Sequence, residues 1–182
     1  MYFTVIRRNI IIIFSILSFA IVLHPTGESV AGTSLIQQKR LRFESAVTMV
    51  AQQYIGISND FGMTSGSSGE MDNSHLFHLI YSEASKIAGM RYLGYAPIKK
   101  LLERTFSVAA DAVRVGDLIA LDNGLVAMIC KFENRAKFHM IYVSRKRQSV
   151  ISFNNQNVVY EIYWVKKLDG FYRLTQYNFF NR

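Results

Sequence analysis

The chain has 182 residues, of which 50% are hydrophobic and 13% aromatic, with only 2 prolines. This composition excludes an intrinsically disordered protein and supplies enough apolar side chains for one domain with a packed core. The formal net charge of +8 favours anionic partners, and the single cysteine, Cys130, excludes an intramolecular disulfide bond. Packing alone must therefore hold the core together.

The first thirty residues have the order of a secretory signal peptide. Arg7 and Arg8 precede an unbroken apolar run over residues 10–23, and the small-residue sequence Ser29-Val30-Ala31 predicts cleavage before Gly32. A spanning helix needs ~20 apolar residues, so an uncleaved membrane anchor is the weaker alternative. We therefore predict a secreted or periplasmic bacterial protein, divided into a signal peptide (1–31), an N-terminal segment (32–42) and one domain (43–182).

Helical patterns come first in this domain. Apolar residues recur at helical spacing over residues 44–54, and Gly56 ends this predicted helix. Asp72 is a good N-cap for a second helix, which ends at Gly89, and Pro97 suits the first turn of a short third helix over residues 98–103. The Gly/Ser-rich residues 62–69 are typical of a loop beside a binding site.

From Ala112 onward, β-branched and aromatic runs alternate with turn residues. The predicted strands are residues 118–121, 125–132, 138–143, 150–153, 158–164 and 171–174. Asp122-Asn123-Gly124 predicts a tight hairpin turn between the first two of them. Helices followed by such strands predict an α+β fold, with N-terminal helices packed on an antiparallel sheet of five to six strands.

Five short segments resemble motifs of the NlpC/P60 family, whose members are papain-like cysteine peptidases that cut the peptide stems of peptidoglycan. They are similar to the end of the family's first helix, its Asp-Cys-Ser nucleophile motif, the turn before the first strand, the His-Val-Gly-Ile strand and the closing strands. In this order the segments are Tyr54-Ile55-Gly56-Ile57, Asp72-Asn73-Ser74-His75, Val115-Gly116-Asp117-Leu118, Gly124-Leu125-Val126-Ala127-Met128-Ile129 and residues 163–173. The resemblance covers nearly all of residues 43–174 and implies a papain-like fold.

The resemblance also implies that the catalytic residues are lost. In the family, a helix N-terminus favours the cysteine thiolate and a histidine of the sheet acts as base, oriented by a third polar residue. When the family's catalytic positions are transferred to this sequence, the nucleophile corresponds to Asn73, the base to Leu125 and the third residue to Tyr142. None of these side chains can perform the family's role, and a leucine accepts no proton at any pH. Asn59 stands where family members place a tyrosine.

The resemblance therefore predicts a ligand-binding groove without catalysis. The residues predicted to line it are Asn59, Asp72, Asn73, Ser74, Leu125 and Tyr142.

Other reactive side chains do not supply a substitute site by sequence. His75 and His78 share one helix face, but two histidines without a third ligand are a weak metal signal, so no metal and no cofactor is predicted. Strand alternation places His139 on the face opposite Tyr142, and Cys130 on the face opposite Leu125 in mid-strand burial. Ser74 could act as a nucleophile only with a base beside it, and the sequence places no base at a matching position.

The leading hypothesis is an exported, monomeric, catalytically inactive homologue of peptidoglycan endopeptidases that binds stem peptides or a cell-envelope protein. One alternative is a cell-wall peptide hydrolase with a rearranged site that uses His75, His78 or Cys130. Another is a small secreted domain in which Leu125 fills the groove as ordinary core. Nucleic acid is not a predicted partner, because the basic run of residues 145–147 lacks aromatic stacking residues, whereas an anionic envelope surface fits the charge.

Overall fold

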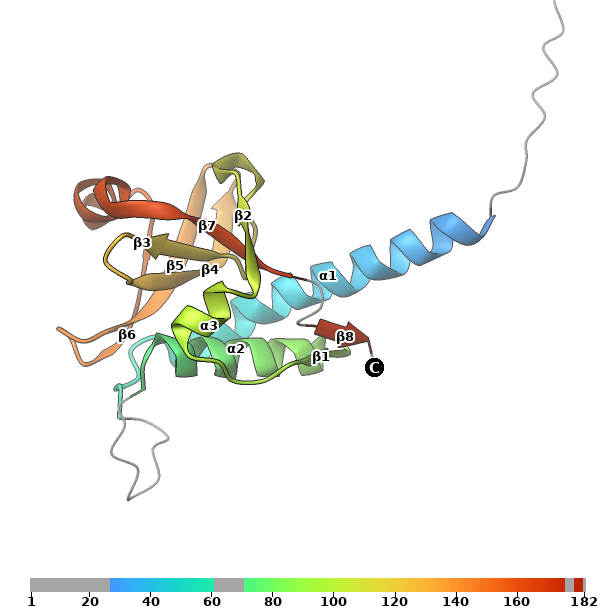
Figure 1. The fold of residues 1–182 in the computed structure, drawn as a ribbon, viewed down its shortest axis with the longest axis horizontal. Coiled ribbons are helices and arrows are strands. Elements are labelled where there is room, and N and C mark those ends of the chain that lie inside the picture. The colour runs from blue at the N-terminus through green and yellow to red at the C-terminus, as the bar shows by residue number, and fades with distance from the viewer. Residues whose placement is uncertain (1–26, 61–70, 176–178, 182) are drawn as a thin grey trace, which may run out of the picture.

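The computed structural model describes residues 27–60, 71–175 and 179–181. Within these ranges the chain is α+β, with helices packed on a six-stranded sheet in which every neighbouring pair is antiparallel (Figure 1). The helices are α1 (Gly27–Tyr54), α2 (Asn73–Ile87) and α3 (Ile98–Leu102). The sheet contains, in spatial order, β2 (Thr105–Val108), β7 (Leu168–Leu174), β3 (Leu118–Leu121), β4 (Val126–Asn134), β5 (Lys137–Ser144) and β6 (Ser149–Asn154). The predicted α+β class is confirmed.

Two further strands lie outside this sheet. β1 (Met90–Tyr92) pairs with β8 (Phe179–Asn181) beside the C-terminal end of α2. None of β1, β2 and β8 is among the predicted strands, because runs of three or four residues are too short for their periodicity to identify a strand. Three short helical turns complete the described elements: η1 (Ala110–Ala112), η2 (Tyr160–Trp164) and η3 (Val165–Lys167).

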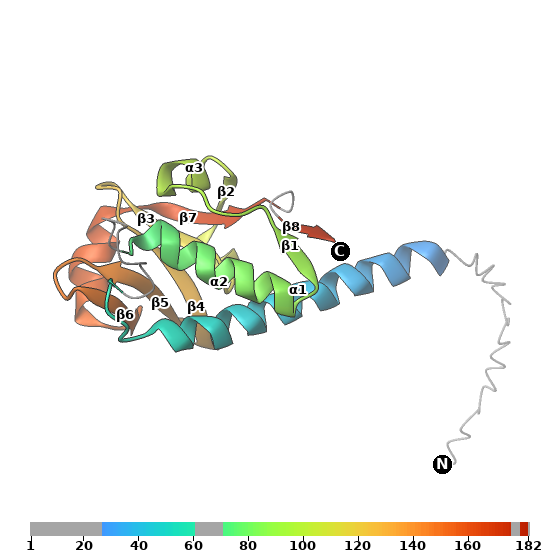
Figure 2. The same ribbon diagram turned by 90° about the horizontal axis from the view of Figure 1, so that it is seen from below.

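Helix α1 is much longer than the predicted helix of residues 44–54. It begins at Gly27 and runs unbroken past both predicted boundaries, at residues 31/32 and 42/43. The added residues include the good helix formers Leu, Gln, Lys and Arg and no proline, so nothing in them ends a helix. Only the C-terminal half of α1 packs along α2, and the N-terminal half projects beyond the rest of the domain (Figures 1 and 2). Cleavage before Gly32 stays a prediction.

The sheet has a different hydrophobic cluster on each face. The helix-side core joins α1 and α2 to one face of the sheet, and the outer cluster lies on the other face against η2. Buried members of the helix-side core include Val47, Val50, Phe77, Ile80, Tyr81, Leu118, Val126, Met128, Cys130, Ile141 and Val143. The outer cluster consists of buried Ile119, Leu121, Ala127, Ile129, Phe138, Met140, Trp164 and Phe171 with their partly buried neighbours. Alternate residues of β4 and β5 therefore belong to different clusters.

The turn before β3 ties the helices to the sheet. Buried Asp117 accepts from Arg173 Nε at 2.8 Å and Nη2 at 2.7 Å, and from the Arg114 N–H. The Tyr81 hydroxyl donates to the Gly116 carbonyl at 2.7 Å. Gly116 has a φ of +89°, and a Cβ there would stand 3.3 Å from the Phe43 ring. The positive φ favours glycine at this turn, and the close approach of the Phe43 ring leaves little room for a side chain.

The predicted strand over residues 158–164 is wrong, because this segment is helical. Asn157 begins it by accepting the Val159 N–H with its side chain and the Tyr160 N–H with its carbonyl. The residues are β-branched and aromatic, which favours a strand by propensity. The spacing of Tyr160 and Trp164 instead turns both rings toward the outer cluster, and this packing overrides propensity.

Among the described residues, no helix is both long and apolar enough to cross a membrane.

Candidate functional site

The N-terminus of α2 is the candidate site, and Asp72 begins it. Its side chain accepts the His75 N–H at 2.9 Å, which is the N-cap bond predicted from the sequence. His75 Nδ1 lies 2.9 Å from the same carboxylate oxygen. Partial burial raises the pKa of Asp72, but hydrogen bonds from His75 and Ser74 outweigh it and lower this pKa below its ordinary value. Asp72 is therefore an ionised, half-exposed carboxylate at neutral pH.

Asn73, the first residue of α2, connects the helix to the sheet. Its Oδ1 accepts the N–H of Val143 in β5 at 2.6 Å. The described pairing of β4 with β5 ends at Met128 and Ile141, so β4 supplies no partner for this buried N–H group. The amide oxygen takes that role, which a cysteine thiol would perform poorly because sulfur is a weak acceptor. Asn73 thus has a structural function, joining the start of α2 to β5.

Ser74 is not arranged as a substitute nucleophile. It is 4% exposed, and its hydroxyl is hydrogen-bonded to Asp72. A nucleophilic serine needs its hydroxyl hydrogen-bonded to a base such as histidine, but the His75 ring is bonded to Asp72 instead. The described geometry therefore gives a carboxylate with two donors rather than a serine–histidine pair.

Four aromatic rings form a surface cluster beside this helix start. The His75 ring stacks on Tyr95 with centroids 4.7 Å apart, and His78 meets the edge of Tyr95 at 5.9 Å and tilts against Tyr92 at 5.8 Å. Burial, and then the charge of His75, lower the pKa of His78, so its neutral form is favoured. The Nδ1 atom of His78 is buried and has no hydrogen-bond partner within the described ranges. We call Asp72, His75, His78, Tyr92 and Tyr95 the histidine–tyrosine cluster.

Sequence reasoning missed the two tyrosines of this cluster. Tyr95 lies in the irregular segment between β1 and α3 and is 45% exposed, and no periodic pattern links it to α2. The available signal was weak: Gly94, at a φ of +102°, turns the chain between two tyrosines three residues apart.

Leu125 and Tyr142 do not lie with Asn73. Both side chains pack in the outer cluster, where Tyr142 meets the edges of Phe153 and Trp164. Asn73 belongs to α2, which packs on the other face. The sheet separates these positions, so the six predicted groove residues do not line one groove. The physical reason is register, because the residues of β4 that face α2 are Val126, Met128 and Cys130.

The other predicted groove residues are neighbours on the helix side. Asn59 is buried; its N–H donates to the Gln148 carbonyl, and its carbonyl accepts the N–H of Met71, the residue directly before Asp72. The segment around Ser58 also pairs with Ser149 at the start of β6. The structure thus brings together Asn59, Asp72, Asn73 and Ser74. The predicted loop of residues 62–69 lies outside the described residues.

Cys130 and His139 occupy the faces predicted by alternation. Cys130 lies in the helix-side core, opposite Leu125, at a β-bulge where it and Lys131 stand against His139. Burial raises the pKa of the Cys130 thiol to about 11, so it is a neutral thiol at neutral pH. The Cys130 side chain points to the same face of the sheet as α2. The thiol is therefore unreactive because it is buried, and not because it points away from the helices. His139 pairs with Glu133 at the surface.

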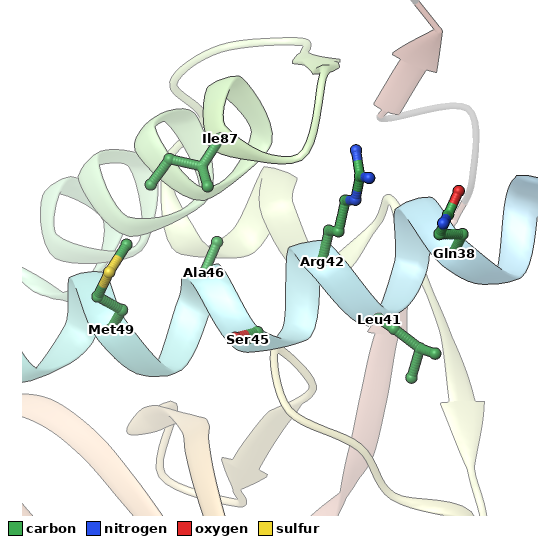
Figure 3. A pocket seen from close by; sticks show the side chains of 7 residues that line it. All are labelled: Gln38, Leu41, Arg42, Ser45, Ala46, Met49 and Ile87. Carbon is green, nitrogen blue, oxygen red and sulfur yellow. The ribbon is translucent and has the colours of Figure 1, made fainter.

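No group of three or more His, Cys, Asp or Glu residues within the described part of the chain could hold a metal ion. A surface groove of about 520 Å³ lies between α1 and the C-terminal end of α2, away from Asp72 (Figure 3). Its lining is mainly aliphatic: Gln38, Leu41, Arg42, Ser45, Ala46, Met49 and Ile87. This set contains no acid, base or nucleophile suited to catalysis, so the groove is not a candidate active site.

Comparison with known proteins gives no family for this chain: no protein-family model matches it, and no curated protein does.

Proposed function

We propose that this protein is an exported, catalytically inactive relative of the NlpC/P60 peptidases that binds peptidoglycan stem peptides at the histidine–tyrosine cluster. One observation carries the proposal: the side chain at the matched nucleophile position accepts the Val143 N–H and holds α2 to β5. A residue with this structural role and without a thiol cannot form an acyl intermediate. The order of helices before an antiparallel sheet, with α2 capped by Asp72, supports the family resemblance.

The chemistry of the cluster suits a peptide with free charged ends. The half-exposed carboxylate of Asp72 can pair with an ammonium group, and the stacked rings of His75 and Tyr95 offer a flat surface for an aliphatic side chain. Stem peptides carry amines, carboxylates and small aliphatic side chains. A cell-envelope protein with the same groups at an exposed segment is the corresponding protein partner.

The test is binding of the purified chain to isolated peptidoglycan and to a synthetic stem peptide by calorimetry. We expect saturable binding that falls at least about tenfold in Tyr95→Ala and His75→Ala, because each removes half of the stacked pair. Tyr163→Ala on the opposite face is the matched control and should bind normally. Failure of the wild-type chain to bind either ligand contradicts the stem-peptide proposal.

The Asp72–His75 pair favours one second candidate, a hydrolase with a rearranged site, because a carboxylate that orients an imidazole is a common catalytic arrangement. Incubation with stem peptides followed by mass spectrometry distinguishes the candidates. Our proposal predicts intact peptide. Cleavage by the wild type that disappears in His75→Ala would replace it with the hydrolase.

A further inference from the structure

The turn between β3 and β4 contains the single Asn-Gly pair of the sequence, Asn123-Gly124. Both residues are exposed. The Gly124 N–H donates to the Leu121 carbonyl at 3.0 Å, and the Leu121 N–H donates to the Leu125 carbonyl at 2.9 Å. Gly124 has a φ of +81°, and a Cβ built there would meet no atom within 4 Å. The turn is therefore a short hairpin loop that ends in a left-handed glycine with open surroundings.

The side-chain amide of Asn123 is held at both of its polar atoms. Nδ2 donates to the Tyr163 hydroxyl in η2 at 2.8 Å, and Oδ1 accepts the Leu125 N–H at 3.2 Å. The neighbouring Asp122 N–H donates to the carbonyl of Lys167 in η3 at 2.9 Å. These hydrogen bonds join the turn to the helical segment, but they lie at the surface, where local fluctuations open them. The amide is thus both exposed and restrained.

An asparagine followed by glycine can react with its own backbone. The Gly124 nitrogen gives its proton to hydroxide and attacks Cγ of Asn123, so that an N–Cγ bond forms and the Cγ–Nδ2 bond breaks. The departing nitrogen takes a proton from water and leaves as ammonia, which regenerates the hydroxide. Water then opens the resulting succinimide ring at either carbonyl, and aspartate or isoaspartate is left at position 123. Glycine favours this reaction because no side chain shields its nitrogen.

We propose that Asn123 is a deamidation site of the folded protein and that its hydrogen bond to the Tyr163 hydroxyl controls the rate. Cγ must turn toward the Gly124 nitrogen before the attack, so the bond from Nδ2 to Tyr163 has to break first. Isoaspartate adds a methylene group to the main chain of a loop that two backbone bonds close, and either product lacks the donor that binds Tyr163. The reaction therefore detaches the β3–β4 turn from η2. It is independent of what the histidine–tyrosine cluster binds.

The test is to incubate the folded full chain at neutral and mildly alkaline pH and to measure deamidation at position 123 by peptide mapping with mass spectrometry. Tyr163→Phe should react about fivefold faster than the wild type, the factor expected for the loss of one ordinary hydrogen bond. Tyr160→Phe is the matched control and should react at the wild-type rate, because it removes a hydroxyl from the same helix and leaves the Asn123 bond in place. The rate should rise with pH, since the attacking nitrogen must lose its proton.

A second measurement, in urea, separates the effect of the fold from the effect of the sequence. In the unfolded chain the wild type and Tyr163→Phe should deamidate at the same rate, and faster than the folded wild type. Asn73-Ser74 is an internal comparison, because its amide accepts the Val143 N–H within the fold, and it should stay intact while Asn123 reacts.

Three results would each overturn the proposal. One is an equal rate for the folded wild type and folded Tyr163→Phe. Another is an intact Asn123 in the folded wild type after the unfolded chain has reacted completely. The third is faster deamidation at Asn73 than at Asn123 in the folded chain.

Discussion

The N-terminus of α2 and the helical segment over residues 158–167 lie on opposite faces of the same sheet and use their side chains in opposite ways. At α2, polar groups are bonded to the protein itself: Asp72 to His75, and Asn73 to Val143. In the segment over residues 158–167, the Trp164 ring is buried, whereas the aliphatic side chains of Ile162 and Val165 remain exposed. The comparison teaches that hydrogen bonding determines the geometry on one face, whereas packing determines it on the other. Substitutions should therefore affect the two faces through different physical terms.

Removing the buried ion pair should have the largest effect on stability. Asp117→Ala leaves the Arg173 guanidinium without its bidentate partner and the Arg114 N–H without an acceptor. We expect the free energy of unfolding to fall by about 4 kcal/mol, measured by urea denaturation. Exposed Asp111→Ala is the control and should change stability by less than about 0.5 kcal/mol. A small effect of Asp117→Ala would mean that the turn is not held electrostatically.

On the outer face, the comparison is between two neighbours in one helical turn. Trp164→Ala removes the buried ring that joins η2 to the outer cluster, and we expect a loss of about 3 kcal/mol. Ile162→Ala removes an exposed side chain and should leave stability nearly unchanged. Equal losses in thermal or urea unfolding would contradict the assignment of Ile162 to the surface.

At the helix start, Asn73→Ala should leave the buried Val143 N–H without an acceptor. The expected cost is about 2 kcal/mol, the desolvation penalty of one unpaired backbone group. Asn73→Asp keeps an acceptor at the same place and, as an anion at a helix N-terminus, should retain most of the stability at neutral pH. If Asn73→Ala and Asn73→Asp have the same free energy of unfolding, the hydrogen bond from the Val143 N–H contributes nothing to stability.

The smallest effect is expected at the N-cap and depends on pH. Asp72→Ala should lower stability by about 1 kcal/mol near neutral pH. Because the pKa of Asp72 is lowered in the folded state, its charge contributes stability above its usual value of 3.8, and this contribution is lost as the pH falls through the lower, folded-state pKa. The difference between wild type and Asp72→Ala should therefore shrink in acid. A constant difference down to the most acidic conditions would show that the charge is irrelevant.

Much of the fold could be predicted from local sequence signals. Asp72 and Gly89 bound α2 because capping is a property of single residues, and Asn123-Gly124 predicts the β3–β4 turn for the same reason. The helical form of residues 158–164 could not be predicted, because it depends on the packing of Trp164 against residues of the outer cluster that are distant in sequence.

The candidate site could be predicted only in part. Alternation along β4 correctly separates Cys130 from Leu125, but one strand read alone does not show which of its faces meets the helices. The family resemblance predicts Leu125 and Tyr142 in one groove with Asn73, but the sheet separates these positions. The contact of Tyr95 with His75 joins elements with no shared periodicity, so only the three-dimensional structure reveals it.

The most direct test of the central claim is to offer one stem peptide to the wild type and to Asn73→Cys and to measure both binding and cleavage. If the helix start is a binding surface without a base, the wild type binds the peptide, and neither protein cleaves it even though the substitution places a thiol at the first residue of α2. Cleavage by Asn73→Cys, lost again in His75→Ala, would show instead that a complete catalytic site lacks only its nucleophile.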